Sequence, residues 1–213
     1  SFIEGLYEDQ KQGEKVKVTC TKSNEGFATA GGVQYVACAG NFKDAGLEYT
    51  GALKVLQMIF SYEYLWIQIR VKGGAYGCMC SFSDQGDSMF VTYRDPNLSE
   101  SYKVYDEAAD YVADFDADDR DMKKYIIGTI GSMDMPMEAV DMGARSFHAY
   151  FLGKTEADLQ KVRDQVLSCT QEDIRALAPI VKAVVEAGNR CCIGNEEKID
   201  QNKEYFDEVK HVL

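Results

Sequence analysis

The sequence contains little histidine: only His148 and His211 occur among its 213 residues. A catalytic zinc site needs three protein ligands, and imidazole nitrogens commonly supply two or all of them. Neither histidine has a second one in its neighbourhood. His148 lies within a predicted helix and is expected to be a structural or surface residue, and His211, near the C-terminal end, is expected to be solvated. We therefore expect no metal site and no cofactor in this chain.

Basic residues and long apolar runs are also scarce. Lysine and arginine number 23 against 35 aspartates and glutamates, which gives a net charge of −12. This balance excludes a general nucleic-acid binder, because such proteins need a basic footprint. No apolar run approaches the roughly 20 residues that span a membrane, and no signal peptide is visible at Ser1. We expect neither a nucleic-acid partner nor a membrane partner.

Proline is rare as well, with three residues, while 46% of the chain is hydrophobic. Both features argue against disorder. A length of 213 residues is enough to bury a core, and no repeat, linker or low-complexity segment divides the chain. Residues 1–213 are therefore predicted to form a single domain.

Seven cysteines are present, and none of the close pairs has the C-x-x-C spacing of a zinc site. Cys78 and Cys80 alternate on a predicted strand, which separates their Cα atoms by about 6.5–7 Å, at the edge of disulfide geometry. Cys191 and Cys192 are adjacent. We interpret the cysteines as free, mostly buried thiols in a reducing cytoplasm, that of a bacterium. A cluster of metal ligands is the alternative.

Acidic residues concentrate between Asp106 and Asp121, close to the expected ends and starts of helices. Solvation and helix N-terminal capping explain most of this concentration. The alternative is an acidic wall that attracts basic peptides.

Alternating apolar residues and turn signals predict strands in both halves of the chain, at 15–21, 33–39, 76–82, 88–93 and 190–194. The glycine-rich segment 26–32 is expected to connect the first two strands. The composition of 83–87 suits a hairpin turn between the third and the fourth.

Helical periodicity starts at Leu47 and is expected to break near Ser61, before a second helix that carries Leu65 and Ile69. After Asp95-Pro96-Asn97, a further helix places aromatic residues in a stripe that we interpret as core, at Tyr102, Tyr105, Ala109 and Val112. The second half is nearly all helical, with amphipathic patterns at 122–130, 140–152, 155–168 and 170–187. Thr155 and Thr170 are each followed by the residues of an N-terminal capping sequence, with aspartate in place of the usual Glu or Gln. These elements predict an α+β fold with an antiparallel β-sheet packed against a cluster of helices.

The segment Arg70 to Cys80 reads R-V-K-G-G-A-Y-G-C-M-C and carries the clearest functional signal. Arg70 offers five N–H donors and stays charged, while Tyr76 offers one O–H group. Three glycines lack side-chain bulk and permit positive φ, so that another backbone can approach, at Gly73, Gly74 and Gly77. Such a loop suits binding a peptide carbonyl or the oxyanion formed when that carbonyl is attacked. A plain turn with a surface arginine and a packed tyrosine is the alternative.

Several separate motifs, in the same order, resemble the C-terminal region of insulinase-like (pitrilysin-type) zinc metallopeptidases, with the presequence-protease subfamily most similar. They are residues 63–77, Tyr93-Arg94-Asp95-Pro96-Asn97-Leu98 and Ile126-Ile127-Gly128-Thr129-Ile130-Gly131. The resemblance runs from about residue 34 to residue 194.

The resemblance implies that this chain is the substrate-binding C-terminal domain of a larger peptidase. The family's zinc motif, H-x-x-E-H, is missing here, so zinc would be bound by an absent N-terminal part of the same polypeptide. The implied partners are those N-terminal domains and unstructured peptide substrates, which are hydrolysed in a closed chamber. Arg70 and Tyr76 match the arginine and tyrosine that the family uses to stabilise the substrate carbonyl or oxyanion, and Gly73, Gly74 and Gly77 would give the peptide room. The chain alone is predicted to be inactive.

Two alternatives stay open at this point. One is a non-catalytic structural or peptide-binding subunit of the same fold, whose parent has lost the zinc motif. The other is an interaction domain with no peptidase partner.

Overall fold

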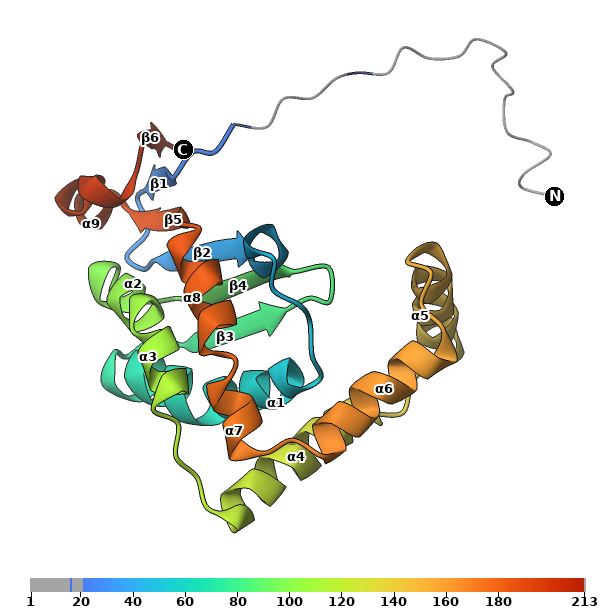
Figure 1. Ribbon diagram of the computed structural model, residues 1–213. Helices are drawn as coiled ribbons and strands as arrows, with labels where there is room; N and C mark the ends of the chain where they lie inside the picture. Colours follow the sequence, from blue (N-terminus) through green and yellow to red (C-terminus); the bar gives the residue numbers. More distant parts are fainter. Residues whose placement is uncertain (1–15, 17–20, 213) are drawn as a thin grey trace, which may run out of the picture.

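The computed structural model describes Val16 and residues 21–212. Within this part of the chain, the strands form one six-stranded sheet in the order β3-β4-β2-β5-β1-β6. Figure 1 shows helices packed on this sheet and a helical arm, α4 to α6, that extends away from it. The strands are β1 (Glu25–Thr29), β2 (Tyr35–Asn41), β3 (Gly77–Phe82), β4 (Asp87–Tyr93), β5 (Asn189–Asn195) and β6 (Glu208–His211).

Among the described α-helices, one lies between β2 and β3, most of the others lie between β4 and β5, and the last lies between β5 and β6. They are α1 (Ala52–Ile59), α2 (Ser99–Asp106), α3 (Ala108–Ala113), α4 (Asp119–Met133), α5 (Ala139–Phe151), α6 (Glu156–Leu167), α7 (Gln171–Arg175), α8 (Ala178–Glu186) and α9 (Glu196–Gln201). Short 3-10 turns occupy Phe42–Ala45 and Lys203–Tyr205. None of the helices in the described part of the chain is long and apolar enough to cross a membrane.

The predicted α+β class is confirmed, and the sheet is mixed rather than wholly antiparallel. The pairs β3–β4, β4–β2 and β2–β5 are antiparallel, as expected. Strand β1, however, pairs in parallel with both β5 and β6. It lies at Glu25–Thr29, inside the glycine-rich segment 26–32 that we had expected to be a connection. Glycine is accepted there because Gly26 packs against Ile199 and Phe206, where a larger side chain would be crowded.

Most of the other predicted elements are confirmed, with shifts of a few residues at their ends. The predicted strand 15–21 lies almost wholly outside the described residues. The predicted helix 170–187 is two helices, because Pro179 lacks an N–H group and starts α8 as a new helix. The helix expected after Asp95-Pro96-Asn97 is likewise divided, into α2 and α3. Helix α9 and strand β6 had no clear signal in the sequence.

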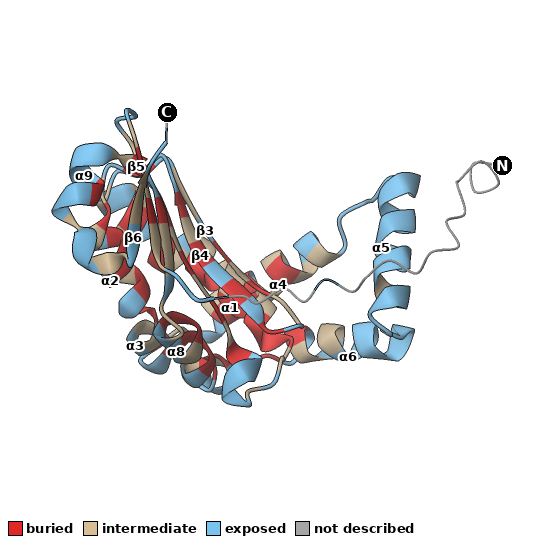
Figure 2. Cartoon of the chain, turned by 90° about the horizontal axis from the view of Figure 1, so that it is seen from above, coloured by how far each residue is buried: buried red, intermediate tan, exposed pale blue. Residues whose placement is uncertain are grey.

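Side-chain alternation assigns one face of the sheet to the core. In β2 and β4, Val36, Cys38 and Phe90 are buried beneath the helices, while Tyr35 and Met89 point to the other face and are exposed. Tyr102 and Tyr105 of α2 are buried too, as predicted from their spacing. Figure 2 shows the buried residues between the sheet and the α2, α3, α8 and α9 side. The opposite face of the sheet keeps a row of exposed apolar side chains, at Tyr35, Met79, Met89, Tyr93 and Ile193.

The segment after α1 stays helical, although we had expected a break near Ser61. Instead of breaking, it changes to π-helical winding over Phe60–Tyr64 and Trp66–Lys72. The N–H of Leu65 bonds to the carbonyl of Phe60 rather than to that of Ser61. Each π turn holds more residues than an α turn, so the face that points to the core shifts along this segment.

Helix caps and an ion pair stabilise the arm and its connection to the core. The capping boxes predicted at Thr155 and Thr170 are both present and start α6 and α7. Arg163 of α6 forms a two-pronged ion pair with Asp134 after α4, with N···O distances of 2.5 and 2.8 Å. Helix α5 at the far end of the arm has no buried residue.

Replacement of Gly40 tests the closeness of the helix layer to the sheet. A Cβ atom at Gly40 would lie 2.5 Å from the backbone oxygen of Val184 in α8. Because backbone cannot move aside cheaply, Gly40→Ala should lower the free energy of unfolding by about 1–3 kcal/mol. Gly143→Ala in α5 is the matched control: a Cβ there meets nothing within 4 Å, so stability should stay or rise by about 0.5–1 kcal/mol. Chemical denaturation of both variants measures this, and equal stability would contradict the close packing.

Candidate functional site

The π-helical segment Trp66–Lys72 ends beside strand β3 and places Arg70 between two aromatic rings. The guanidinium carbon lies 4.5 Å from the ring centre of Trp66 and 5.5 Å from that of Tyr76. Rings attract a guanidinium through its flat face, so the N–H groups in its plane stay available for hydrogen bonds. No acceptor among the described residues takes a hydrogen bond from this side chain.

Tyr76 precedes β3 and is 64% exposed. Its ring packs edge-to-face against Tyr93, at 5.8 Å between centres, and Tyr93 packs in the same way against Tyr35. The backbone N–H of Tyr76 bonds to the carbonyl of Arg94 at 3.2 Å. The phenol oxygen has no hydrogen-bond partner in the part of the chain that the structure describes. The two predicted residues are therefore neighbours: Arg70 is half-buried and Tyr76 is exposed, and neither polar group has a hydrogen-bond partner among the described residues.

The three glycines of this loop have different reasons for being glycine. Gly74 has a φ of +82°, a conformation that favours glycine. At Gly73, a Cβ would lie 2.6 Å from the carbonyl oxygen of Ile69, so the end of the helix itself needs glycine. Neither reason applies to Gly77, because its φ is not positive and a Cβ there would only contact Tyr93 at 3.7 Å. Of the three glycines, all of which permit positive φ, only Gly74 adopts it.

The loop is held in place by the segment that follows β4. The side-chain amide of Asn97 donates to the carbonyl of Gly73 at 2.6 Å. Asp95 is fully buried and accepts hydrogen bonds from the hydroxyl of Ser101 at 2.6 Å and the backbone N–H of Asn97 at 2.9 Å. Burial raises the pKa of Asp95, although these hydrogen bonds oppose the rise. Arg94 adopts a positive φ of 49°, rare for a residue other than glycine.

Sequence reasoning did not assign these supporting roles. The motif Arg94-Asp95-Pro96-Asn97 was visible as part of the family resemblance, but nothing in the sequence alone joins Asn97 to Gly73, 24 residues earlier. A short polar side chain after Asp-Pro is a common turn signal, and it was interpreted only as a stop to the strand.

The histidines and cysteines do not come together in the structure. His148 is exposed on α5, and His211 is exposed on β6 beside Glu196, at 3.3 Å. Within the described residues, no three histidine, cysteine, aspartate or glutamate side chains are grouped as metal ligands. The described cysteines are free thiols, and Cys20 lies outside the described residues. Burial raises the pKa of Cys38 and Cys78 to about 11, which makes both poor nucleophiles.

Comparison with known families identifies the domain. A family described as the PreP C-terminal domain matches residues 24–195, which is most of the chain. The chain belongs to this family. The match includes the Arg70–Tyr76 loop and the segment that supports it.

Relatives of this PreP C-terminal domain include longer proteins from bacteria and plants. Protein HypA of Clostridium perfringens is 43% identical over 192 residues, which cover 90% of this chain and 20% of that protein. Presequence protease 1, chloroplastic/mitochondrial, of Arabidopsis thaliana is 34% identical over 194 residues, which cover 89% of this chain and 18% of that protein. The chain therefore spans about a fifth of the length of these curated relatives. Because they come from different compartments, the bacterial cytoplasm stays a prediction.

The same fold occurs in solved structures. The peptidase M16 inactive domain from Pseudomonas fluorescens superposes with a TM-score of 0.60 at 16% identity, over 82% of this chain and 44% of that one. At this identity the likeness concerns the fold. The fold of the PreP C-terminal domain is thus that of M16 peptidase domains.

Loss of the Asn97 side chain tests how the loop is held. In Asn97→Ala the carbonyl of Gly73 loses its donor, so the free energy of unfolding should fall by about 1–3 kcal/mol. Amide hydrogen exchange at residues 73–76 should also become faster. The control is Asn189→Ala, which removes a comparable side-chain hydrogen bond, to the carbonyl of Ala39. If the control speeds exchange at residues 73–76 as much as Asn97→Ala does, Asn97 has no special role there.

Proposed function

We propose that this chain is the substrate-contacting C-terminal domain of a zinc metalloendopeptidase that hydrolyses unstructured peptides in a closed chamber. The observation that carries the proposal is the Arg70–Tyr76 pair: two directional donors, one half-buried and one exposed, held side by side in a domain of the PreP family. A relative named as a presequence protease supports the same activity class.

In this proposal, Arg70 and Tyr76 act on the carbonyl of the bond being cleaved. Water attack turns that carbonyl oxygen into an oxyanion, and donors already aimed at its position stabilise it without having to reorganise. The stacking of Arg70 on Trp66 limits where its N–H groups can point. Gly77, which no steric demand of the chain explains, would leave space for the backbone of the peptide. Gly73 and Gly74 would shape the same loop.

Zinc would be bound by the absent N-terminal part of the same polypeptide and would activate the attacking water. The residues present here do not fit that role, because the two histidines lie on different elements, α5 and β6, and are far from the loop in sequence. The N-terminal domains of the same chain are the proposed partners, and residues 1–213 are proposed to act as one domain.

A non-catalytic, peptide-binding subunit of the same fold is the second candidate. It is supported by a structural neighbour described as an inactive M16 peptidase domain. An H-x-x-E-H sequence upstream in the same reading frame favours the peptidase, and a lost motif favours the subunit.

Conservative replacements in the full-length polypeptide test the catalytic assignment. Tyr76→Phe removes one hydroxyl and keeps the ring, so turnover should fall on the order of 10²–10³-fold with little change in KM or melting temperature. Arg70→Lys keeps the charge but loses the planar fork, and should also lower turnover.

The controls are Tyr150→Phe and Arg120→Lys, which alter exposed side chains on α5 and α4. Both should behave as wild type. Wild-type turnover in Tyr76→Phe would refute the assignment, and a large loss of melting temperature would favour a structural role for the tyrosine.

The isolated chain provides a second test. The purified 213 residues should bind no stoichiometric zinc and should not cleave an unstructured peptide, because no pair of histidines is available to hold the metal. Metal analysis and a peptide assay with and without chelator measure both properties, with the full-length polypeptide as the positive control. Chelator-sensitive cleavage by the isolated chain would contradict the proposed division of labour.

A further inference from the structure

A pocket of about 940 Å³ lies next to the Arg70–Tyr76 pair, between the helical arm and the edge of the sheet. Its walls come from α1 and the π-helical segments, from both ends of β3, and from α4, α5, α6 and the turns of the arm. Helix α6 is fixed against this wall because the backbone N–H of Gly51 donates to the side chain of Gln165 at 2.8 Å. The pocket is therefore built by the fold.

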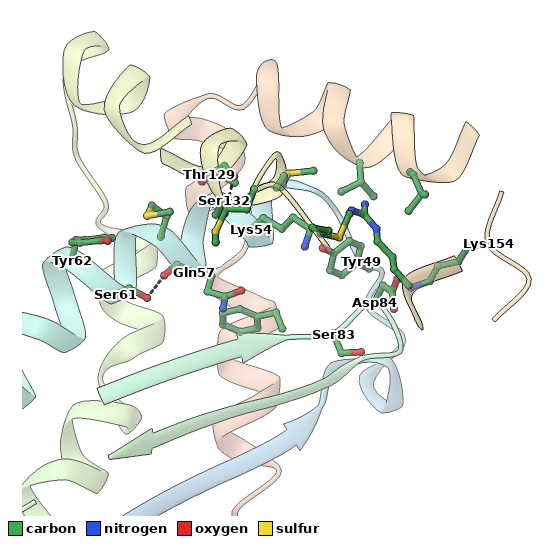
Figure 3. A pocket seen from close by; sticks show the side chains of 18 of the residues that line it. Tyr49, Lys54, Gln57, Ser61, Tyr62, Ser83, Asp84, Thr129, Ser132 and Lys154 are labelled. Atoms are coloured by element: carbon green, nitrogen blue, oxygen red, sulfur yellow. Dashed lines mark hydrogen bonds and ion pairs between the residues drawn. The ribbon is translucent and has the colours of Figure 1, made fainter. Parts of the chain in front are cut away.

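The charge of the pocket is opposite to that of the whole chain. The chain carries 35 acidic and 23 basic residues. The charged residues that line the pocket are three cations and one carboxylate: Lys54, Arg145, Lys154 and Asp84. Figure 3 shows Lys54, Asp84 and Lys154 converging on one part of the pocket, beside Tyr49. An anion entering there would meet more positive than negative charge.

Two of these cations lack a carboxylate within the described part of the chain. Lys154 forms an ion pair with Asp84. Among the described residues, the guanidinium of Arg145 donates a hydrogen bond only to the sulfur of Met137, at 3.9 Å, and Lys54 has no hydrogen-bond or ion-pair partner. Lys54 is also half-buried, and burial lowers its pKa. An ammonium group in this position loses part of its hydration, and the nearby negative charge, that of Asp84, is already paired with Lys154. A ligand carboxylate would supply the missing direct partner.

Three hydroxyl groups of the pocket are already used as hydrogen-bond donors. The hydroxyls of Ser61, Thr129 and Ser132 already donate to backbone carbonyls of their own helices, each at 2.8 Å. The remaining lining is largely apolar and includes methionines, which adapt to ligands of varied shape, at Met58, Met133, Met135 and Met137. The pocket thus combines cationic donors with a pliable apolar wall.

Trp66 connects the pocket to the proposed catalytic pair. Its side chain lines the pocket, and its ring lies against the guanidinium of Arg70. An extended peptide held at Arg70 and Tyr76 can therefore continue past Trp66 into the pocket, with an apolar side chain against the methionines.

We propose that this pocket is a subsite for a carboxylate of the bound peptide, held by Lys54 and Arg145. The carboxylate is either the C-terminal one or that of an acidic side chain. The inference rests on the proposed function, because it takes the ligand to be a peptide, but it concerns binding and not the chemical step.

Fluorescence anisotropy with labelled ten-residue peptides of leucine and serine tests it on the 213-residue chain. One peptide has a free C-terminus, a second is amidated, and a third is amidated and carries one internal glutamate. The free acid or the glutamate peptide should bind about tenfold or more tightly than the amidated neutral peptide. Whichever of the two binds tightly identifies the source of the carboxylate. Equal affinity for all three peptides would overturn the subsite.

Substitutions connect the effect to the pocket. Lys54→Met keeps the length of the side chain and Arg145→Gln keeps its polarity; each should abolish the preference for the carboxylate without lowering the melting temperature. Lys182→Met, on the exposed side of α8, is the matched control and should keep the preference. A preference that survives Lys54→Met and Arg145→Gln together would overturn the proposal.

The full-length polypeptide distinguishes failure of the subsite from failure of the catalytic proposal. There, Lys54→Met should raise KM for carboxylate peptides and leave turnover unchanged. Unchanged KM would mean that another part of the polypeptide fills the pocket, which would overturn the peptide subsite. Wild-type turnover in Tyr76→Phe would refute the catalytic assignment while leaving the binding preference intact.

Discussion

In the part of the chain that the structure describes, the helices cover one face of the sheet only, and the rest of the structure depends on this constraint. Strands β2 and β4 send Val36, Cys38 and Phe90 toward the helices, and the next residues along each strand point the other way. Because α8 approaches β2 as closely as Gly40 allows, the space between these two elements cannot hold a ligand. A ligand can therefore bind at the open face or at the edge of the sheet formed by β3, where Arg70 and Tyr76 lie.

At that edge, the protein holds an arginine with aromatic rings instead of with a carboxylate. An ion pair would use up the in-plane N–H groups of Arg70 and would partly cancel its charge. Stacking on Trp66 restrains the side chain, leaves the in-plane N–H groups free and does not cancel the charge. The same ring borders the cationic pocket, so a single tryptophan separates the two positions at which we propose that a peptide is held.

The sequence predicted the parts of the molecule that follow from local rules. Alternation located β2, β3 and β4, capping residues located the starts of α6 and α7, and helical spacing located the buried Tyr102 and Tyr105. The loop from Arg70 to Tyr76 was predicted as well, because an arginine, two glycines and a tyrosine lie close together in the sequence.

What could not be predicted depends on contacts between distant segments. Strand β1 was hidden by its glycine, which α9 explains only once the chain is folded. The bond from Asn97 to Gly73 and the pocket residues Lys54 and Arg145 belong to segments separated by tens of residues. Helix α5 shows a related limit: its amphipathic pattern predicted a helix correctly, but its apolar side stays exposed in this chain.

The π-helical winding before Arg70 makes the length of this segment as important as its composition. A π turn contains roughly one residue more than an α turn, and each residue of an α-helix turns the chain by about 100°. Deletion of one residue between Phe60 and Lys72 would keep all remaining side chains unchanged. It would nevertheless rotate Arg70 away from Tyr76 and from the end of β3. The fold should therefore tolerate substitutions along the outer surface of this helix better than insertions or deletions within it.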